Sequence, residues 1–457
     1  MERVIIINKA TDLKFKGKTV AVTGIGISNR PLINYLLDKG AVITARDIKP
    51  REKLEPYITE IENKGVKIIT GENYLDGINE EYIFRSPGIR YDKPAFINAV
   101  NNGSALTSEM ELFLELCPAK ITGVTGSNGK TTTTTIISLI LEAQFGKVYV
   151  GGNIGVPLLP LAEQMTENDH VVVELSSFQL QTMNKSPDTA VITNISPNHL
   201  DYHKDMDEYA EAKKNIFYHQ LPGSKLILNY NCGVTRGFID EANPGVDVIY
   251  FGHESGVFEK DNIIYYKNEY ILNAGDILLP GRHNTENYMA AIGATAELAS
   301  KENIAGIAGS FNGVEHRMEF VRELNGIKYY NSSIDSSPSR TIAALSVFGQ
   351  KVIVICGGSD KNIPFEPLVK PLIEKAKTIV LTGAARPKIK EALLNGGNTE
   401  LPVIIEESGF ADAVIKAHEA ATPGDIVLLS PACASYDAFQ NFEERGNLFK
   451  KIVNNLK

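Results

Sequence analysis

Residues 121–135 read I-T-G-V-T-G-S-N-G-K-T-T-T-T-T, and this stretch decides the expected fold. It predicts a short apolar strand from Ile121 to Val124, a glycine-rich turn, and a helix that begins at about Lys130. Backbone N–H groups of such a turn surround a phosphate chain, and the helix N-terminus adds partial positive charge. The Lys130 ammonium then reaches the outer phosphates, and the Thr131 hydroxyl can bind Mg²⁺. The stretch therefore predicts a nucleotide phosphate loop.

The loop is a variant of the usual pattern. The motif G-x-x-x-x-G-K-S/T needs glycine at position 124, where this chain has Val124. A flexible turn before an ordinary helix is the alternative, but strand, turn, lysine and hydroxyl all follow in the expected order. The residues expected around the phosphates are Gly126, Ser127, Asn128, Gly129, Lys130, Thr131 and Thr132.

Length and composition limit the possible classes of protein. The chain has 457 residues, which predicts about three domains at ~100–200 residues each. A net charge of −9, with acids and bases mixed, argues against a nucleic-acid partner and predicts that anionic ligands are held by local devices. The four cysteines are far apart and fit a reducing cytoplasm. No apolar run approaches the ~18 residues of a membrane span.

Residues 18–47 predict a first β-α-β unit with a glycine turn. Gly24 and Gly26 form the first half of a dinucleotide-binding pattern, but Asn29 stands at the third glycine position. Asp47 ends the second strand, where a ribose-binding acid would stand. Three readings stay open: a nicotinamide cofactor, a uridine or other nucleotide diphosphate, and a tight turn without a ligand.

A second polar turn is expected in the same region. A strand ends at Arg85 and is followed by the turn Ser86-Pro87-Gly88. Open α/β sheets collect ligands at the carboxyl ends of their strands, so this turn is a candidate binding segment. Residues 98–118, which include an amphipathic E-M-E-L-F-L-E-L segment, are expected to link to a second domain.

From residue 121 to about 310, short β-branched runs alternate with helices, as expected of parallel strands buried on both faces. Polar residues follow three of these runs: Asn153, Glu174 and His199. A carboxylate at the end of an apolar strand is costly to bury unless a cation meets it. Glu174 is therefore a candidate Mg²⁺ ligand, with a helix N-cap as the alternative. For His199, a metal role and a structural role stay open.

Spacing alone says less about the later residues. Lys213 and Lys214 lie on a predicted helix and would ordinarily be surface lysines. Asn284 and Asn287 stand near the start of a long helix, where such amides read a base edge or cap the helix. The chain from about residue 314 again alternates β-α-β, which predicts a third Rossmann-type domain.

Seven motifs occur in an order that resembles the Mur ligases, the cytoplasmic enzymes that build the peptidoglycan stem peptide. They are T-G-S-N-G-K-T-T, G-G-N-I-G-V-P, E-L-S-S-F-Q-L, N-H-L-D-Y-H, G-R-H-N-T-E-N, E-H-R-M-E and S-P-A-C-A-S-Y-D-A-F-Q-N-F-E-E-R-G. The resemblance spans the whole chain, and the third and last motifs look most like the D-glutamate-adding members. It implies a Rossmann-like UDP-sugar domain (1–108), a central P-loop ATPase-type parallel-sheet domain (109–313) and a Rossmann-like amino-acid-binding domain (314–457).

The resemblance also implies a reaction. A carboxylate of UDP-N-acetylmuramoyl-L-alanine would attack the γ-phosphate of ATP, and the amine of D-glutamate would then attack the acyl phosphate. Lys130, the loop amides and Mg²⁺, with two ions expected, would relieve the repulsion between anionic reactants. We expect a cytoplasmic monomer with no membrane or nucleic-acid partner. The alternatives are another Mur-type or folylpolyglutamate-type ligase and a non-catalytic nucleotide-binding regulator.

The resemblance implies roles for individual residues. The residues around Mg²⁺ would be Thr131, Glu174, His199 and Lys213. The catalytic residues would be Lys130, Glu174, His199 and Lys213. Lys213 would be carbamylated, because a neutral amine that adds CO₂ becomes an anion able to bridge to a second Mg²⁺; Lys214 is the rival by adjacency. Further ATP-binding residues would be Asn284, Asn287 and Arg317. The UDP-sugar residues would be Gly26, Ile27, Ser28, Asp47, Ser86, Pro87, Gly88 and Asn153. The D-glutamate residues would be Ser336, Lys361, Ser435 and Phe442.

One segment departs from the family pattern. Many relatives read N-D-S-K-A-T-N where residues 331–337 read N-S-S-I-D-S-S. Ser332 and Ile334 thus replace the acid and the lysine that would contact ATP. Asp335 and Arg340 are the candidates to substitute for them.

Overall fold

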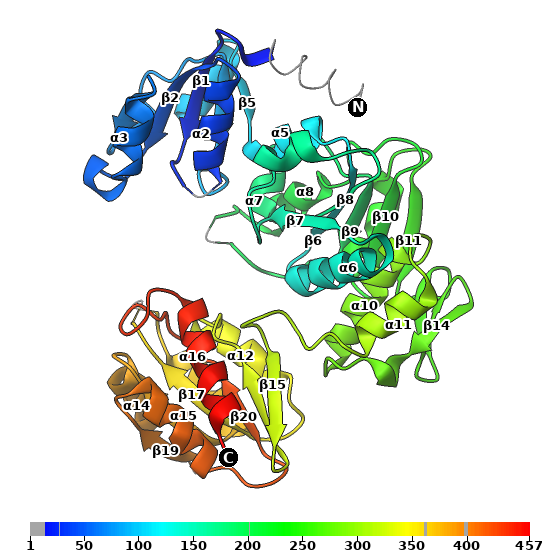
Figure 1. Cartoon of the computed structure of the whole chain (residues 1–457), viewed down its shortest axis with the longest axis vertical. Coiled ribbons are helices and arrows are strands. Elements are labelled where there is room, and N and C mark those ends of the chain that lie inside the picture. Colours follow the sequence, from blue (N-terminus) through cyan, green and yellow to red (C-terminus); the bar gives the residue numbers. More distant parts are fainter. Residues whose placement is uncertain (1–13, 27, 201, 361–362, 397–400) are drawn as a thin grey trace. The chain divides into compact units, whose positions relative to one another are not determined.

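The computed structural model of the chain describes residues 14–26, 28–200, 202–360, 363–396 and 401–457. It contains three β-sheets, each built from a different part of the chain (Figure 1). The contacts group the chain into two compact units, of which the second consists of Ile277–Arg282 and Ser310–Lys457. The first unit contains two of the sheets. The expected mixed α/β class with parallel sheets is confirmed, and the boundaries after residues 108 and 313 stay predictions.

The first sheet has the order β3-β2-β1-β4-β5 and is parallel throughout. Its strands are β1 (Thr19–Thr23), β2 (Val42–Asp47), β3 (Lys67–Thr70), β4 (Tyr82–Arg85) and β5 (Ala105–Thr107). The helices between them are α2 (Asn29–Asp38), α3 (Tyr57–Glu62), α4 (Pro94–Asn101) and a short 3₁₀ turn, η1 (Arg51–Lys53). The strand order reverses beside β1, so the turns after β1 and β4 lie at the edge where such sheets bind ligands.

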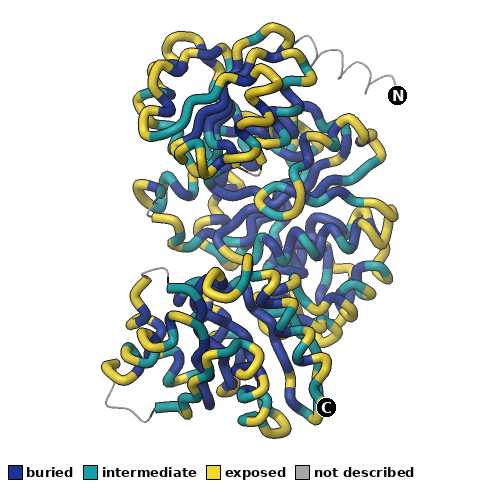
Figure 2. The backbone as a smooth tube through the Cα atoms, turned by 60° about the vertical axis from the view of Figure 1, so that its left-hand side comes forward, coloured by how far each residue is buried: buried dark blue, intermediate teal, exposed yellow. Residues whose placement is uncertain are grey.

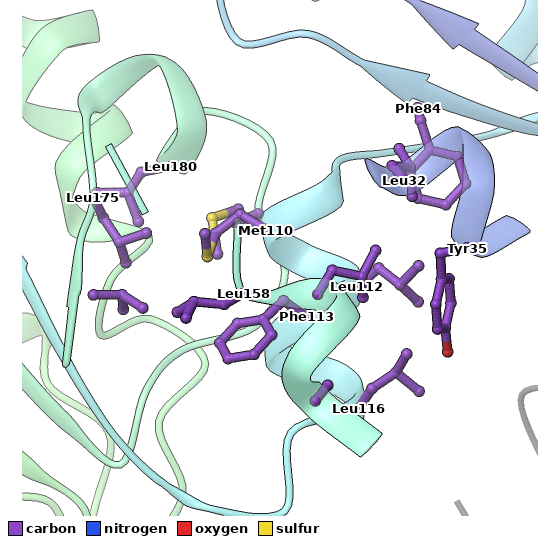
Figure 3. Close-up of a cluster of buried hydrophobic side chains, with 14 of the residues drawn as sticks. Leu32, Tyr35, Phe84, Met110, Leu112, Phe113, Leu116, Leu158, Leu175 and Leu180 are labelled. Carbon is purple, nitrogen blue, oxygen red and sulfur yellow. The ribbon is translucent and has the colours of Figure 1, made fainter. Parts of the chain in front are cut away.

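Helix α5 (Glu109–Leu116) leads from the first sheet to the second. Ser108 caps it by accepting a hydrogen bond from the Glu111 N–H at 3.2 Å. Figure 3 shows Leu112 and Leu116 beside Tyr35 of α2, with Phe113 on the side toward Leu158. The expected linker, residues 98–118, was therefore too long, because β5 pairs with β4 in the first sheet and only α5 serves as the connection.

The central sheet has the order β14-β13-β12-β11-β10-β9-β6-β8-β7. Its strands are β6 (Lys120–Thr125), β7 (Val148–Gly152), β8 (His170–Glu174), β9 (Thr189–Ile192), β10 (Lys225–Asn229), β11 (Asp247–Phe251), β12 (Val257–Lys260), β13 (Ile263–Tyr266) and β14 (Glu269–Asn273). The strands from β6 to β11 pair in parallel, whereas β12, β13 and β14 form an antiparallel extension. Strand β6 lies between β8 and β9, so three strand ends meet at the phosphate loop.

The helices of this part follow the expected alternation. They are α6 (Lys130–Phe145), α7 (Ser177–Leu180), α8 (Met206–Lys214), α9 (Gly233–Arg236), α10 (Arg282–Thr295) and α11 (Lys301–Ala308), with 3₁₀ turns η2 (Leu159–Gln164), η3 (Gly237–Glu241) and η4 (Ala274–Asp276). The start of α6 at Lys130 confirms the predicted helix boundary. Figure 2 shows buried residues as dark-blue stretches in the interior, with most exposed residues, in yellow, at the periphery.

The sheet of the second unit has the order β15-β16-β20-β17-β18-β19. Its strands are β15 (Glu319–Leu324), β16 (Ile327–Asn331), β17 (Val352–Gly357), β18 (Ala376–Thr382), β19 (Val403–Glu406) and β20 (Ile426–Leu429). The helices are α12 (Pro338–Ser346), α13 (Glu366–Lys375), α14 (Arg386–Asn395), α15 (Phe410–Glu419) and α16 (Phe442–Asn455). The sequence prediction missed β15, which pairs with β16 in an antiparallel hairpin. Asn325 and Gly326 both have positive φ there, as a tight hairpin turn requires.

Among the residues described, no helix combines the length and the hydrophobicity needed to cross a lipid bilayer.

A buried acid stands at the start of α5. Glu109 is 7% exposed, and its Oε1 atom has no hydrogen-bond partner among the described residues. Burial raises the pKa of Glu109 to about 7, although a hydrogen bond with the Leu159 backbone opposes this effect. The Glu109 carboxyl group therefore titrates near pH 7 instead of near pH 4.5.

Replacing this acid tests the burial argument. The folded chain binds the Glu109 proton more tightly than the unfolded chain, so wild-type stability falls as pH rises from about 4.5 toward about 7. At ~1.4 kcal/mol per pKa unit the loss is at most ~3.5 kcal/mol. We expect Glu109→Gln to gain stability relative to the wild type between pH 5 and pH 8, measured from urea-denaturation midpoints. Glu115→Gln, whose side chain is 38% exposed, is the control and should change little. An advantage of Glu109→Gln that does not grow with pH would contradict the argument.

Candidate active site

The glycines of the predicted phosphate loop are required by its geometry. Gly126 and Gly129 have φ values of 147° and 80°, which disfavour a side chain. A Cβ atom on Gly126 would lie 1.9 Å from Thr193 Oγ1, and one on Gly129 would lie 2.3 Å from Asn287 Oδ1. The loop is therefore packed against the end of β9 on one side and against α10 on the other.

Polar groups of the segment after β9, together with Tyr209 of α8, hold the loop in shape. The Ser127 hydroxyl donates to the Ser196 carbonyl at 2.9 Å and lies 3.0 Å from the Tyr209 hydroxyl. The Asn128 N–H donates to Asn194 Oδ1 at 3.0 Å. Sequence reasoning missed Asn194, Ser196 and Tyr209; a polar run directly after a buried strand was the available signal for the first two.

The start of α6 places a cation at the loop. Lys130 Nζ donates to the carbonyl groups of Gly126 at 2.9 Å and Ser127 at 3.1 Å. Thr132, in the same first turn, is half-buried. An ammonium that already lies over the loop can transfer these hydrogen bonds to phosphate oxygens.

Glu174 brings three predicted residues together. It is 1% exposed, its Oε2 accepts from the Thr131 hydroxyl at 2.6 Å, and its Oε1 accepts from Asn153 Nδ2 at 2.7 Å. The alternative role as a helix cap is wrong, because Ser176 caps α7 by accepting from the Gln179 N–H. The carboxylate instead points toward the first turn of α6.

The two adjacent lysines on α8 face different surroundings. Lys213 is 1% exposed, and its Nζ donates to the Gly126 carbonyl at 2.9 Å. Lys214 forms an ion pair with Glu241 at 2.6 Å, away from the loop. Burial, reinforced by the nearby Lys130 charge, holds the pKa of Lys213 well below its usual range. The geometry therefore favours Lys213 over Lys214 as a neutral amine beside the loop.

His199 lies in the segment that follows β9. Its φ of 55° is left-handed, and its ring meets Phe178 of α7 edge-on with 4.9 Å between centroids. His203, four residues later, is 1% exposed and contacts the Ser177 hydroxyl at 2.9 Å. His203 is thus a structural histidine of the α7 contact, while the metal role of His199 stays a prediction.

One of the two predicted amides of α10, Asn287, reaches the loop and the first turns of α6, and Asn284 is bonded to it. Asn287 Oδ1 accepts from the Thr133 hydroxyl at 3.3 Å, and its Nδ2 donates to Asn284 Oδ1 at 3.1 Å. Both asparagines are buried. Asn287 therefore helps to shape the loop, and its role in base recognition is not tested by these contacts.

In the first sheet, Asp47 organises the turn after β1. Its carboxylate accepts from the N–H groups of Ile25 at 2.6 Å and Lys49 at 2.8 Å. A Cβ atom on Gly24 would lie 2.7 Å from Ser86 Cβ, so the two expected binding turns touch. The other residues predicted there are Gly26, Ser28, Pro87 and Gly88, which belong to these turns, and Ile27, which lies outside the described residues.

A buried arginine that sequence reasoning did not assign joins these turns to α7. Arg85 is 1% exposed and donates to the carbonyls of Pro87 at 3.1 Å, Ile89 at 2.6 Å and Phe178 at 3.0 Å. The Tyr202 hydroxyl donates to the same Pro87 carbonyl at 3.1 Å. An arginine at the end of a buried strand, directly before a Ser-Pro-Gly turn, was the signal in the sequence.

The remaining predicted residues lie in the second unit. Ser435 is 3% exposed, and Phe442 begins α16 and is half-buried. Ser336 and Arg317 are also half-buried. Lys361 lies outside the described residues, so its predicted role is not examined by the structure.

The donor set at Glu174 fits Mg²⁺. The carboxylate is buried, its two hydrogen-bond partners are neutral, and the Thr131 hydroxyl adds a second oxygen. Within the described part of the chain, no group of three or more His, Cys, Asp or Glu side chains could hold a metal ion. Magnesium is usually bound by one or two carboxylates together with water and substrate phosphates, so one buried carboxylate beside a phosphate loop is sufficient.

Family models match two parts of the chain. The model described as Mur ligase middle domain matches residues 124–295, and the model described as Mur ligase, glutamate ligase domain matches residues 316–433. The first match contains the phosphate loop, Glu174 and Lys213, whose geometry is given above.

Curated relatives match nearly the full length. The chain is 48% identical to a UDP-N-acetylmuramoylalanine–D-glutamate ligase of Acetivibrio thermocellus, over 97% of this chain and 98% of the relative. It is 50% identical to the protein of the same name from Ruminiclostridium cellulolyticum, over 97% of each. The fold is also similar to that of MurC of Thermotoga maritima, with a TM-score of 0.57 and 16% identity over 96% of this chain and 100% of MurC. For MurF of Acinetobacter baumannii the TM-score is 0.59, with 16% identity over 96% of this chain and 92% of MurF.

A methyl group on the loop should disrupt it. We expect Gly126→Ala to weaken ATP binding roughly tenfold or more, about 1.4 kcal/mol, because the added Cβ atom would overlap Thr193 Oγ1 and the positive φ is strained. Titration with a fluorescent ATP analogue measures the effect. Gly306→Ala on α11, where a Cβ atom meets nothing within 4 Å, is the control and should bind normally. Equal affinities of the two variants would show that the loop does not bind the phosphates.

Proposed function

The chain belongs to the Mur ligase family, and from this premise we propose that it joins D-glutamate to UDP-N-acetylmuramoyl-L-alanine at the expense of ATP, in peptidoglycan synthesis. Relatives of that name, 48–50% identical over 97% of the chain, support this choice among family members. One observation carries the chemistry: the phosphate loop, the Glu174 carboxylate and the buried Lys213 amine converge on the ends of β6 and β8.

Charge repulsion is the main barrier to the first step. A carboxylate oxygen of the L-alanine end attacks the γ-phosphorus of ATP, the bond to the β-γ bridging oxygen breaks, and ADP leaves. Lys130 and the backbone amides of the loop stabilise the charge on the transferring phosphoryl group and align it with the attacking oxygen. The products of this step are an acyl phosphate and ADP.

The second step forms the amide. The unprotonated amine of D-glutamate attacks the acyl carbon, the tetrahedral intermediate collapses, and inorganic phosphate leaves with the C–O bond electrons. The nitrogen loses a proton to give the neutral amide. The phosphate is a good leaving group because the first step has already activated the carboxyl carbon.

Residues at the loop would hold the metal ions. Thr131 and Glu174 would bind one Mg²⁺, with Asn153 and His199 lining the same site, and a carbamylated Lys213 would bridge to a second. The ions, when bound, supply Lewis-acid charge that neutralises the phosphate oxygens. Lys213 suits this modification because burial and the nearby Lys130 charge hold the pKa of its amine well below its usual range, which favours the neutral form that adds CO₂.

The other assignments complete the proposal. The turns after β1 and β4 would bind the UDP-sugar, and Ser336, Lys361, Ser435 and Phe442 would bind D-glutamate in a Rossmann-like last domain. Asn284, Asn287 and Arg317 would contact ATP. We propose a cytoplasmic monomer of three domains, with boundaries near residues 108 and 313. Closure of the last domain would bring the substrates together.

A phosphate-release assay tests the reaction. We expect phosphate release only when ATP, UDP-N-acetylmuramoyl-L-alanine and D-glutamate are all present. Lys130→Ala should lower kcat roughly 10²–10³-fold, because it removes a cation from the transferring phosphoryl group. Lys120→Ala, an exposed lysine at the start of β6, is the control and should keep full activity. Release with a different amino acid or a folate would indicate another ligase, and no release with any substrate would indicate a non-catalytic regulator.

Chemical rescue tests the carbamate. Lys213→Ala should lose most activity and regain part of it when a short-chain carboxylate such as acetate is added, because carboxylate oxygens replace those of the carbamate. Lys214→Ala should remain active, since Lys214 pairs with Glu241. The assay is the same phosphate release, with sodium chloride replacing acetate as a control for ionic strength. A fully active Lys213→Ala, or rescue at position 214 instead, would refute the assignment.

A further inference from the structure

Residues 331–337, in which the chain departs from the family pattern, fold toward the interior of the second unit. Ser332, at the position of the missing acid, is fully buried, and its hydroxyl accepts from the Met318 N–H at 3.2 Å. Its own N–H donates to the Leu429 carbonyl at 2.8 Å. Ser332 is therefore part of the packing between β16 and β20.

The acid that stands three residues later is also buried. Asp335 is 6% exposed, and its Oδ2 accepts from the Ser430 hydroxyl at 2.8 Å. The Ser430 oxygen also lies 2.9 Å from Thr341 Oγ1, on α12. Ser430 directly follows β20, so the Asp335 carboxylate holds the carboxyl end of that strand.

A second anchor holds the same segment further along. The Arg445 guanidinium is 2% exposed and donates to the carbonyls of Ser333 at 2.8 Å, Cys433 at 3.1 Å and Ala434 at 3.1 Å. Residues 430–435 are thus anchored at Ser430 by Asp335 and at Cys433 and Ala434 by an arginine that is itself fixed on Ser333. Both anchors depend on the short loop after β16.

This arrangement buries the ionisable carboxyl group of Asp335, which is unfavourable when the group is charged. Burial raises the pKa of Asp335 to about 6, while the hydroxyls of Ser332 and Ser430 and the charges of Arg340 and Arg317 oppose the rise. A buried carboxylate is weak evidence for stability, because well-packed apolar groups of similar size stabilise a core at least as well. The hydrogen bond to Ser430 is what this carboxylate provides and an apolar group could not.

We propose that Asp335 is a positioning residue for the amino-acid substrate and does not replace the lost nucleotide contact. Through Ser430 it fixes residues 430–435, so that Ser435 is held in place for D-glutamate. The loop that carries Asp335 also carries Ser336, the next residue and a further candidate ligand for D-glutamate. The loop after β16 therefore supplies Ser336 to the amino-acid site and also anchors the segment that carries Ser435. This inference rests on the proposed D-glutamate ligase function.

Steady-state kinetics of the full chain separate the two roles. In Asp335→Ala, the Ser430 hydroxyl loses its buried acceptor, and we expect KM for D-glutamate to rise roughly 5–100-fold, which is the range for an unsatisfied buried polar group. KM for ATP should stay within about twofold of the wild type. Asp335→Asn keeps an oxygen acceptor, so it should restore KM for D-glutamate to within about threefold. Ser430→Ala removes the same hydrogen bond from the other side and should raise KM for D-glutamate in the same direction.

A matched acid provides the control. Asp425 lies just before β20, at the opposite end of the strand, where its carboxylate accepts from the Thr422 N–H at 2.8 Å and pairs with Lys377 at 2.6 Å. Asp425→Ala should leave both KM values unchanged. If Asp335→Ala unfolds at the assay temperature in a thermal scan, Ser430→Ala decides the question.

Three results would overturn the proposal. A rise in KM for ATP with an unchanged KM for D-glutamate would make Asp335 a nucleotide residue. An Asp335→Asn variant as impaired as Asp335→Ala would show that the charge matters and not the hydrogen bond. Unchanged kinetics in both Asp335→Ala and Ser430→Ala would show that the anchor is not needed. A wild-type chain that is inactive with D-glutamate is a different outcome, since it refutes the proposed function itself.

Discussion

The hydrogen bond between the Glu174 carboxylate and the Thr131 hydroxyl is the constraint on which the first unit's site depends. It exists because β8 pairs with β6 in parallel, so Glu174 and the glycine loop end at the same edge of the sheet. A carboxylate that is 1% exposed beside two neutral partners is expensive to bury unless a cation joins it. The same geometry makes the site suitable for a metal ion and for the phosphates it accompanies.

Charge also explains the choice between the two lysines of α8. Lys213 is buried against the loop carbonyl, and the nearby Lys130 charge adds to the cost of its protonated form. Lys214 avoids this cost by pairing with Glu241. Adjacent residues on a helix point about 100° apart, so one faces the loop and the other does not. A neutral amine beside a phosphate loop is the chemical state that the proposed carbamate requires.

In the second unit, the buried polar groups of the loop after β16 form hydrogen bonds with other groups of the same unit. The loop after β16 is held inward by Ser332, Ser333 and Asp335, and through Ser430 and Arg445 it fixes the segment that ends at Ser435. Ser332, which stands where the family pattern has an acid, is buried and hydrogen-bonded within this packing.

Much was determined by sequence alone: the glycine-rich turn after β6, the start of α6 at Lys130, the alternating parallel strands and the family all follow from local pattern and motif order, because backbone geometry and capping depend on near neighbours. Sequence could not distinguish Lys213 from Lys214, reject the cap role of Glu174, or find β15 and Arg85. Those outcomes depend on strand register, helix rotation and burial between residues far apart in the chain. Only the tertiary structure decides them, because long-range packing sets which charged groups lose their water and which partners replace it.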